Sequence, residues 1–186
     1  HSADSLEPTI DLSEALALAS SQLVELMERG EGEEAEILEF QLAMLEDEAL
    51  SDPVRQAVAA GTTLIEAWQQ TLDEHVTDYE QSEDEYFQAR ASDLRDIRER
   101  VLRILLGETE AEIPEGAILL ATDLTPSRFL SLDWNKGGGV VLREGSPSSH
   151  VAMLARSRGV PMLVGIGDLQ TGAIPDQTRL LLLSLI

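Results

Sequence analysis

The chain of 186 residues carries 35 Asp and Glu against 13 Lys and Arg, a formal net charge of −22, with 43% hydrophobic residues and no cysteine. This composition excludes a disordered chain and a disulfide framework, and the negative field disfavours nucleic acid or an anionic membrane as a partner. No apolar run is long enough to span a bilayer, and no secretory pattern is present. We therefore expect a cytoplasmic protein.

The negative charge is concentrated in the first part of the chain. Residues 1–107 hold 26 acidic and 7 basic side chains, whereas residues 108–186 hold 9 and 6. This change predicts a domain boundary. The acidic part either attracts a basic partner or only keeps the surface solvated, and a charge count does not separate these alternatives.

Helical periodicity in residues 11–107 predicts a bundle of four or five helices joined by short turns. Asp11 or Ser13 can cap a first helix, and Gly30 is a natural stop for it. A second helix is expected over residues 33–48.

The rest of the first part predicts three further helices. Residues 51–53, Ser-Asp-Pro, are typical of a cap with proline in the first turn, for a short helix that ends at Gly61. Residues 63–106 contain no proline or glycine and are too long for one ordinary globular helix. Ser82 and Glu85 fit a capping box, which would divide this stretch into two helices.

The remainder of the chain alternates strand and helix patterns, which predicts an α/β unit. Apolar runs indicate buried strands at residues 117–121, 138–142 and 162–164. Between them, one helix carries Pro126 in its first turn and another begins near His150.

A turn of small residues delivers His150 to the start of this last helix. Ser148 or Ser149 can cap the helix, and the N–H groups of its first turn would stabilise a nearby phosphate. Neutral imidazole is a good nucleophile near pH 7. The pattern fits a phosphoryl carrier, and a hydrogen-bonded structural histidine is the alternative.

The run GSPSSHVAMLARSRGVPMLVGIG, residues 145–167, resembles the phosphohistidine motif of enzymes that use phosphoenolpyruvate. The stretches at 44–48, 92–97 and 123–127 extend the resemblance, in the expected order, to enzyme I of the bacterial phosphoenolpyruvate:sugar phosphotransferase system.

The resemblance implies an α/β swivelling phosphohistidine domain with a largely antiparallel α-helical bundle inserted into it. It divides the chain into a possible remnant of the swivelling domain or a linker at residues 1–10, an acidic bundle at 11–107 that docks the phosphocarrier protein HPr, and the α/β domain at 108–186. An acidic bundle suits HPr because that protein presents a basic and apolar face.

The implied activity is that of a phosphoenolpyruvate-protein phosphotransferase. His150 would take a phosphoryl group from phosphoenolpyruvate on Nε2 and pass it to a histidine of HPr. Ser148 and Ser149 would orient the ring or bind the phosphate, and Thr125 would lie beside the histidine. Arg156 is expected to be structural first and a phosphate contact second, because six helical residues turn it about 120° away from His150.

The partner-binding residues implied by the resemblance are Glu46, Asp47, Glu48 and Arg95. The alternative for the acidic triplet is the polar end of an amphipathic helix. In full-length enzyme I, phosphoenolpyruvate and Mg²⁺ bind to a separate C-terminal barrel domain that this chain lacks. We therefore expect no cofactor or metal here, no reaction with phosphoenolpyruvate by this chain alone, and a homodimer for the full-length protein.

Two departures from the family pattern affect the site. Ser146 and Pro147 follow Gly145 where enzyme I commonly has two adjacent glycines, which predicts a stiffer loop. Phe129 stands where a hydroxyl residue is often found, so any hydrogen bond from that hydroxyl to the histidine must be replaced or absent.

Of three alternatives to a stand-alone enzyme I, two stay open and one is disfavoured. A multiphosphoryl transfer protein, including the dihydroxyacetone kinase phosphotransfer subunit, would look the same over this stretch. Pyruvate phosphate dikinase and phosphoenolpyruvate synthase share the motif, but the acidic helical insertion argues against them. A regulatory docking module could keep the fold without phosphoryl transfer.

Overall fold

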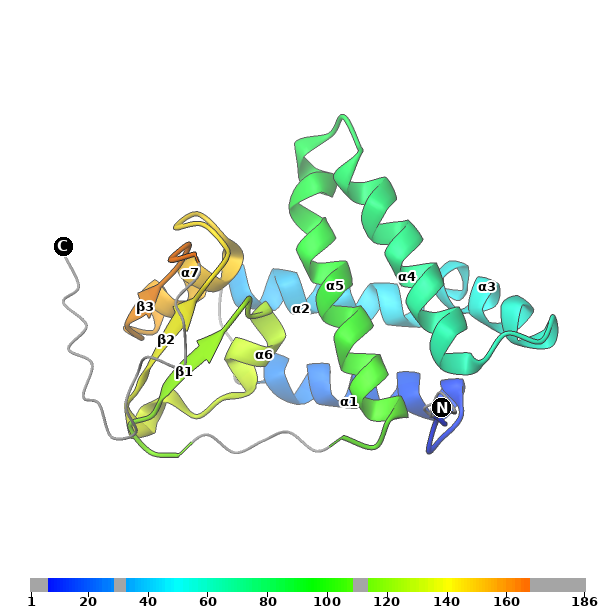
Figure 1. The fold of residues 1–186 in the computed structure, drawn as a ribbon, viewed down its shortest axis with the longest axis horizontal. Coiled ribbons are helices and arrows are strands. Elements are labelled where there is room, and N and C mark those ends of the chain that lie inside the picture. The colour runs from blue at the N-terminus through cyan, green and yellow to red at the C-terminus, as the bar shows by residue number, and fades with distance from the viewer. Residues whose placement is uncertain (1–6, 29–32, 109–113, 168–186) are drawn as a thin grey trace. The chain divides into compact units, whose positions relative to one another are not determined.

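A computed structural model describes residues 7–28, 33–108 and 114–167 of the chain. It divides into two compact units, His1–Ala111 and Glu112–Ile186 (Figure 1). The first unit is helical and the second contains a small parallel sheet with helices, so the expected combination of a helical bundle and an α/β unit is confirmed. Among the described helices, none is both long and apolar enough to cross a membrane.

The described part of the helical unit contains five helices. Helix α4 packs against α3 and α5, α1 packs against α2, and α5 also contacts α1 and α2. Helices α4 and α5 form a long hairpin whose tip stands clear of the other helices of this unit (Figure 1). The elements are α1 (Leu12–Met27), α2 (Glu33–Glu46), α3 (Glu48–Ala59), α4 (Leu64–Glu80) and α5 (Glu85–Leu105).

Two of the helix starts follow local sequence rules. Asp11 caps α1 by accepting a bond of 2.9 Å from the Glu14 amide, which confirms one of the two predicted caps. Thr63 caps α4 by accepting a bond of 3.3 Å from the Glu66 amide, and its hydroxyl donates to the Glu66 carboxylate at 2.9 Å.

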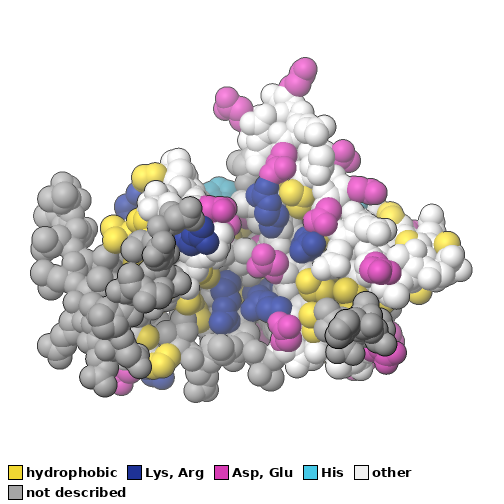
Figure 2. All heavy atoms as spheres, in the orientation of Figure 1, with side chains coloured by type: hydrophobic (Ala, Val, Ile, Leu, Met, Phe, Trp, Pro, Cys, Tyr) yellow, Lys and Arg dark blue, Asp and Glu magenta, His cyan; other side chains and the backbone are white. Residues whose placement is uncertain are grey.

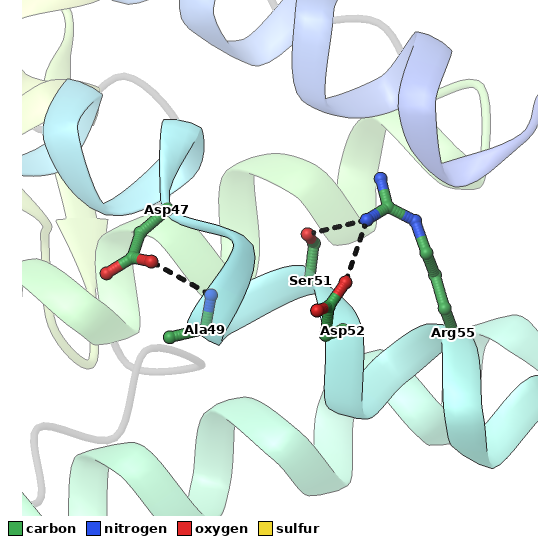
Figure 3. Close-up of polar contacts among 5 residues, drawn as sticks. All are labelled: Asp47, Ala49, Ser51, Asp52 and Arg55. Carbon is green, nitrogen blue, oxygen red and sulfur yellow. Dashed lines mark hydrogen bonds and ion pairs between the residues drawn. The ribbon is translucent and has the colours of Figure 1, made fainter.

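The start of α3 corrects the sequence prediction. Asp47 accepts a hydrogen bond of 2.8 Å from the Ala49 amide, so α2 ends at Glu46 and α3 begins at Glu48 (Figure 3). The predicted second helix was therefore too long by two residues. Ser51 is not the cap of α3, because the carboxylate of Asp47 caps the helix one turn earlier; the Ser51 hydroxyl accepts a bond of 3.0 Å from Arg55 instead.

The break between α4 and α5 lies where we expected it, but the predicted capping box is wrong. Asp84 caps α5 through a bond of 2.9 Å from the Tyr86 amide. Ser82 lies two residues before this cap, where its hydroxyl accepts from the Asp84 amide and its carbonyl accepts from the Gln88 side chain. Asp84 immediately precedes the helix, so its carboxylate reaches the amides of the first turn, whereas Ser82 lies two residues further from them.

The core of the bundle contains polar residues that hydrophobic periodicity did not predict. Asp93 and Asp96 of α5 are fully buried, and so is Gln41 of α2. The Gln41 amide donates to the Asp96 carboxylate at 3.0 Å, which joins α2 to α5. On the other side of α5, the buried indole of Trp68 donates to the Arg98 carbonyl at 3.0 Å. Polar contacts therefore fix α5 against both neighbours.

The α/β unit has a three-stranded parallel sheet in the order β1-β2-β3. Its elements in chain order are β1 (Ile118–Ala121), α6 (Pro126–Ser131), the 3-10 helix η1 (Trp134–Lys136), β2 (Gly139–Leu142), α7 (His150–Ser157) and β3 (Met162–Leu163). The central strand β2 is buried along its whole length. All three predicted strands and both predicted helices are confirmed.

Candidate functional site

The candidate site lies where the chain leaves β2 and enters α7, at the carboxyl edge of the parallel sheet. Open α/β sheets bind ligands at this edge, because the loops that follow the strands converge there. Beyond β2, the Glu144 amide donates to the Thr122 carbonyl at 2.9 Å, and the Gly165 amide donates to the Glu144 carbonyl at 3.2 Å. The start of the loop is therefore held from both neighbouring strands.

A tight turn then brings the chain to the helix. The Ser149 amide donates to the Ser146 carbonyl at 3.1 Å, which closes a four-residue turn with Pro147 in its second position. Proline is favoured at that position because its fixed φ suits the turn. The departure from the family's glycine pair therefore produces a defined turn. The hydroxyls of Ser146 and Ser148 lie 3.0 Å apart on its exposed side.

His150 is the first residue of α7, and Ser149 is its cap. The Ser149 side chain accepts a hydrogen bond of 3.4 Å from the Ala152 amide, which decides between the two predicted capping serines. Ser149 and His150 are both half-buried. A helix start leaves backbone N–H groups without helical partners and carries a partial positive charge, so phosphate carried near this end would be stabilised.

Thr125 occupies the N-cap position of α6, yet its hydroxyl makes no capping bond. The Oγ1 atom is buried and has no hydrogen-bond partner among the residues that the structure describes. Helix α6 packs against α7, the helix that begins at His150. A buried hydroxyl without a partner is costly, so Thr125 is a candidate to bond the phosphorylated histidine or its phosphoryl group.

Arg156 lies in the last turn of α7 and is exposed. Six residues separate it from His150, a rise of about 9 Å along the helix axis, so it belongs to the opposite end of the helix. A cation is favoured at a helix C-terminus by the macrodipole. This geometry supports the structural role that we ranked first.

Phe129 is fully buried and stacks on Trp134, with ring centroids 5.0 Å apart. The Trp134 indole also donates to the Phe129 carbonyl at 2.8 Å. The position that often carries a hydroxyl in the family is therefore part of the hydrophobic core in this chain.

The predicted partner-binding residues of the bundle have structural roles as well. The triplet Glu46, Asp47 and Glu48 spans the α2–α3 junction, with all three side chains exposed and Asp47 serving as a cap. Arg95 of α5 forms an ion pair with Glu80 of α4. The triplet is therefore the junction of two helices rather than the end of one.

An aromatic cluster near this junction was missed by the sequence interpretation. The cluster consists of Phe40, Tyr79, Tyr86 and Phe87, four of the seven aromatic residues in the chain. The ring of Phe87 packs edge-on against those of Tyr79 and Tyr86, with centroids 5.2 and 5.6 Å away. Tyr86 is 55% exposed and Phe87 is 39% exposed. The sequence signal was the gathering of aromatics within residues 79–87, in a chain with only 4% aromatics.

Arg90 holds the aromatic cluster together. Its guanidinium lies 5.0 Å from the Phe40 ring centroid and 5.2 Å from that of Tyr86, and it bonds to the buried Asp93 carboxylate at 3.2 Å. Burial raises the pKa of Tyr79, and repulsion between the ionised phenolate and its neighbours Tyr86 and Asp47 raises it further. The aromatic cluster and the acidic triplet share α2, because Phe40 lies on that helix and Glu46 is its last residue.

Within residues 7–28, 33–108 and 114–167, no group of three or more His, Cys, Asp or Glu side chains could hold a metal ion.

Two family models match the chain. One described as "PEP-utilising enzyme, N-terminal" matches residues 3–90, and one described as "PEP-utilising enzyme, mobile domain" matches residues 113–182. The chain belongs to the family of PEP-utilising enzymes.

Individual relatives and solved structures agree with this assignment. The chain is 33% identical over 174 residues to a phosphoenolpyruvate-protein phosphotransferase of Haloferax volcanii, covering 89% of this chain and 30% of that protein. It is 34% identical over 140 residues to multiphosphoryl transfer protein 2 of Escherichia coli, covering 73% of this chain and 17% of that protein. The resemblance to the N-terminal region of enzyme I is confirmed.

The fold comparison adds a solution structure of enzyme I, with a TM-score of 0.68 and 28% sequence identity. The match covers 86% of this chain and 68% of that one. In contrast, the chain spans less than a third of the length of the two curated relatives named above.

Proposed function

We propose that the chain is the phosphohistidine-bearing part of an enzyme I, a phosphoenolpyruvate-protein phosphotransferase, in which His150 relays a phosphoryl group to HPr. The observation that carries the proposal is the position of His150 as the first residue of the Ser149-capped helix α7, at the carboxyl edge of a parallel sheet. The names of the curated relatives support the same chemistry.

In the transfer step, the Nε2 lone pair of His150 attacks the phosphorus atom in line, and the bond between phosphorus and the donor breaks as the new P–N bond forms. The phosphoryl group then moves to a ring nitrogen of HPr in the same way, with His150 leaving as neutral imidazole. Positioning and charge stabilisation account for most of the catalysis of such a loose transition state. Ser149, Ser148 and Thr125 are the side chains we assign to orient the ring or bond the phosphoryl oxygens.

The donor site would lie outside this chain. The full-length protein would bind phosphoenolpyruvate and Mg²⁺ in a further C-terminal domain and form a homodimer. The α/β unit would be the swivelling domain that carries His150 between donor and acceptor, with the helical bundle inserted into it. We expect this chain alone to exchange phosphoryl groups with phosphorylated HPr but not with phosphoenolpyruvate.

HPr would dock on the surface formed by the acidic triplet and the aromatic cluster. The carboxylates of Glu46 and Glu48 would attract its basic side chains, while Tyr86 and Phe87 offer the exposed apolar area that a stable contact requires. Arg95, paired with Glu80, would fix the α4 and α5 side of this surface.

Transfer from radiolabelled phospho-HPr tests the proposal. The unmodified chain should gain acid-labile, base-stable label, and His150→Ala should lose it. His75→Gln is the matched control, because it removes a histidine of α4 outside the candidate site and should keep the label. If the unmodified chain binds HPr but gains no label, the regulatory docking module is the better interpretation. A fusion of the multiphosphoryl type would give the same label and is distinguished by the sequence of the full-length gene product.

A further inference from the structure

The acidic surface charge of the helical bundle affects its stability, independently of phosphoryl transfer. Of the carboxylates whose exposure the structure describes in this unit, only those of Asp93 and Asp96 are buried. Figure 2 shows the exposed acidic side chains spread over the helical unit, up to the tip of the α4–α5 hairpin. Residues 1–107 have only 7 basic side chains to balance 26 acidic ones.

Most of these basic side chains are already committed to ion pairs. Four arginines of the bundle bind carboxylates: Arg55 binds Asp52, Arg90 binds Asp93, Arg95 binds Glu80 and Arg98 binds Asp73. Even if all 7 basic side chains of residues 1–107 were paired with carboxylates, 19 of the 26 acidic side chains would have to be balanced by cations from the solvent.

Several of the acidic residues that do not cap helix starts occupy positions that oppose helix formation. The last turns of α1, α2, α3 and α4 contain no basic residue, although cations are favoured there. Glu25, Glu46 and Asp78 lie instead at the negative ends of α1, α2 and α4, where a carboxylate is unfavourable.

Like charges also face each other along single helices. Glu74 and Asp78 are four residues apart on α4, and Glu36 and Glu39 are three apart on α2, spacings at which side chains are neighbours. Such like-charge pairs destabilise a helix. Repulsion is thus built into the bundle both locally and through its net charge.

We infer that the acidic bundle reaches its full stability only at high ionic strength, on the order of 1 M monovalent salt, where the Debye length shrinks to about 3 Å from about 10 Å at 0.1 M. At the higher ionic strength, carboxylates on neighbouring turns no longer repel each other strongly. The α/β unit serves as an internal reference, since residues 108–186 carry 9 acidic and 6 basic side chains and have little net charge to screen.

Each unit contains one tryptophan, which allows the two to be followed separately in the full-length chain. Trp68 is buried in α4, and Trp134 belongs to η1 of the α/β unit. The Trp134→Phe variant reports urea unfolding of the bundle, and the Trp68→Phe variant reports that of the α/β unit. We expect the urea midpoint of the bundle to rise about twofold between about 0.05 M and about 2 M KCl, and that of the α/β unit to rise by far less.

A charge-removing variant separates screening of repulsion from a general effect of salt on hydrophobic burial. Glu25, Glu74 and Asp78 are exposed and have no partner among the described residues. In the Trp134→Phe background, Glu25→Gln, Glu74→Gln and Asp78→Asn together should raise the midpoint at low salt and flatten its rise with KCl. The matched control, Glu25→Asp, Glu74→Asp and Asp78→Glu, keeps the charge and should keep the salt dependence.

Three results would overturn the inference. The first is a bundle midpoint that does not change with KCl. The second is an equal rise in both units, which would indicate a general salt effect on burial. The third is a charge-removing variant that responds to KCl as steeply as its charge-conserving control.

Discussion

The amide and the hydroxyl of Thr9 both donate to the carbonyl of Leu105, at 2.7 and 3.1 Å. Helix α5 ends in a Schellman motif, in which the Glu108 amide bonds to the Arg103 carbonyl and that of Gly107 bonds to Ile104. The Leu105 carbonyl lies outside that motif and is satisfied by Thr9. The segment before α1 is therefore fastened to the end of α5, so that the two ends of the bundle meet.

Replacing Thr9 tests this fastening. Thr9→Val keeps the amide and the shape of the side chain but removes the hydroxyl, and should lower the free energy of unfolding of the bundle by about 1 kcal/mol. Thr9→Ser keeps the hydroxyl and should lower it by less. Urea unfolding followed by Trp68 fluorescence measures both. Equal losses in the two variants would show that the hydroxyl does not stabilise the bundle.

Gly138 sets the start of β2 and gives a sharper test of the α/β unit. Its φ is +108°, and a Cβ atom there would lie 2.4 Å from the Ala117 carbonyl oxygen. Gly137 has a φ of +78°, but a Cβ atom on Gly137 would have no heavy atom of the described residues within 4 Å. Gly138→Ala should therefore unfold the α/β unit or lower its stability by more than about 3 kcal/mol. Gly137→Ala should cost about 1–3 kcal/mol of backbone strain without a steric clash, because the Gly137 backbone (φ 78°, ψ −168°) lies in a region that is favourable only for glycine.

Trp134 fluorescence during urea unfolding separates these two variants, because this residue belongs to the same unit. Similar stabilities for Gly138→Ala and Gly137→Ala would mean that the backbone moves away from Ala117 at little cost. That result would contradict the close approach as the reason for glycine at position 138.

The accuracy of the sequence interpretation depended on whether a signal was local. Asp11 was identified as a possible cap because a polar cap next to an apolar helical pattern is visible within a few residues. The starts of α3 and α5 were misplaced because several residues could cap: Asp47 competes with Ser51, and Asp84 competes with Ser82. Local rules rank such candidates only weakly, and packing of the helix decides between them.

Features that join distant segments could not be predicted from one sequence. Buried Asp96 looks like a surface residue until Gln41 of another helix is brought within 3.0 Å of it. The aromatic cluster likewise needs α2, α4 and α5 to be assembled before Phe40, Tyr79 and Phe87 become neighbours. At the candidate site, the motif around His150 was identified from its sequence alone, but the choice of Ser149 over Ser148 as the cap required the backbone.

The two serines at the start of α7 have different predicted effects on phosphorylation. Ser149 caps the helix, so Ser149→Ala should destabilise α7 by about 1 kcal/mol and lower the rate of label transfer from phospho-HPr. Among the residues that the structure describes, Ser148 bonds only to Ser146 on the exposed side of the turn, so Ser148→Ala should leave stability unchanged. A lower transfer rate in Ser148→Ala without any loss of stability would assign its hydroxyl to the phosphoryl group. If Ser149→Ala transfers label at the unmodified rate, the cap does not position His150.

The proposed docking surface combines charge and apolar contact, and salt separates their contributions. Glu46→Gln with Glu48→Gln removes two charges but keeps the Asp47 cap, so it should weaken HPr binding several-fold at low salt and hardly at all at about 1 M salt, where charges are screened. Phe87→Ala removes exposed apolar area, so it should weaken binding about tenfold at either salt concentration.

Val58→Ala, which truncates an exposed apolar side chain of α3 outside the cluster, is the control for Phe87→Ala and should not change binding. Calorimetric titration with HPr provides the dissociation constants. Unchanged binding by Phe87→Ala would exclude the aromatic cluster from the interface, because an apolar contact, unlike an ion pair, is not weakened by screening.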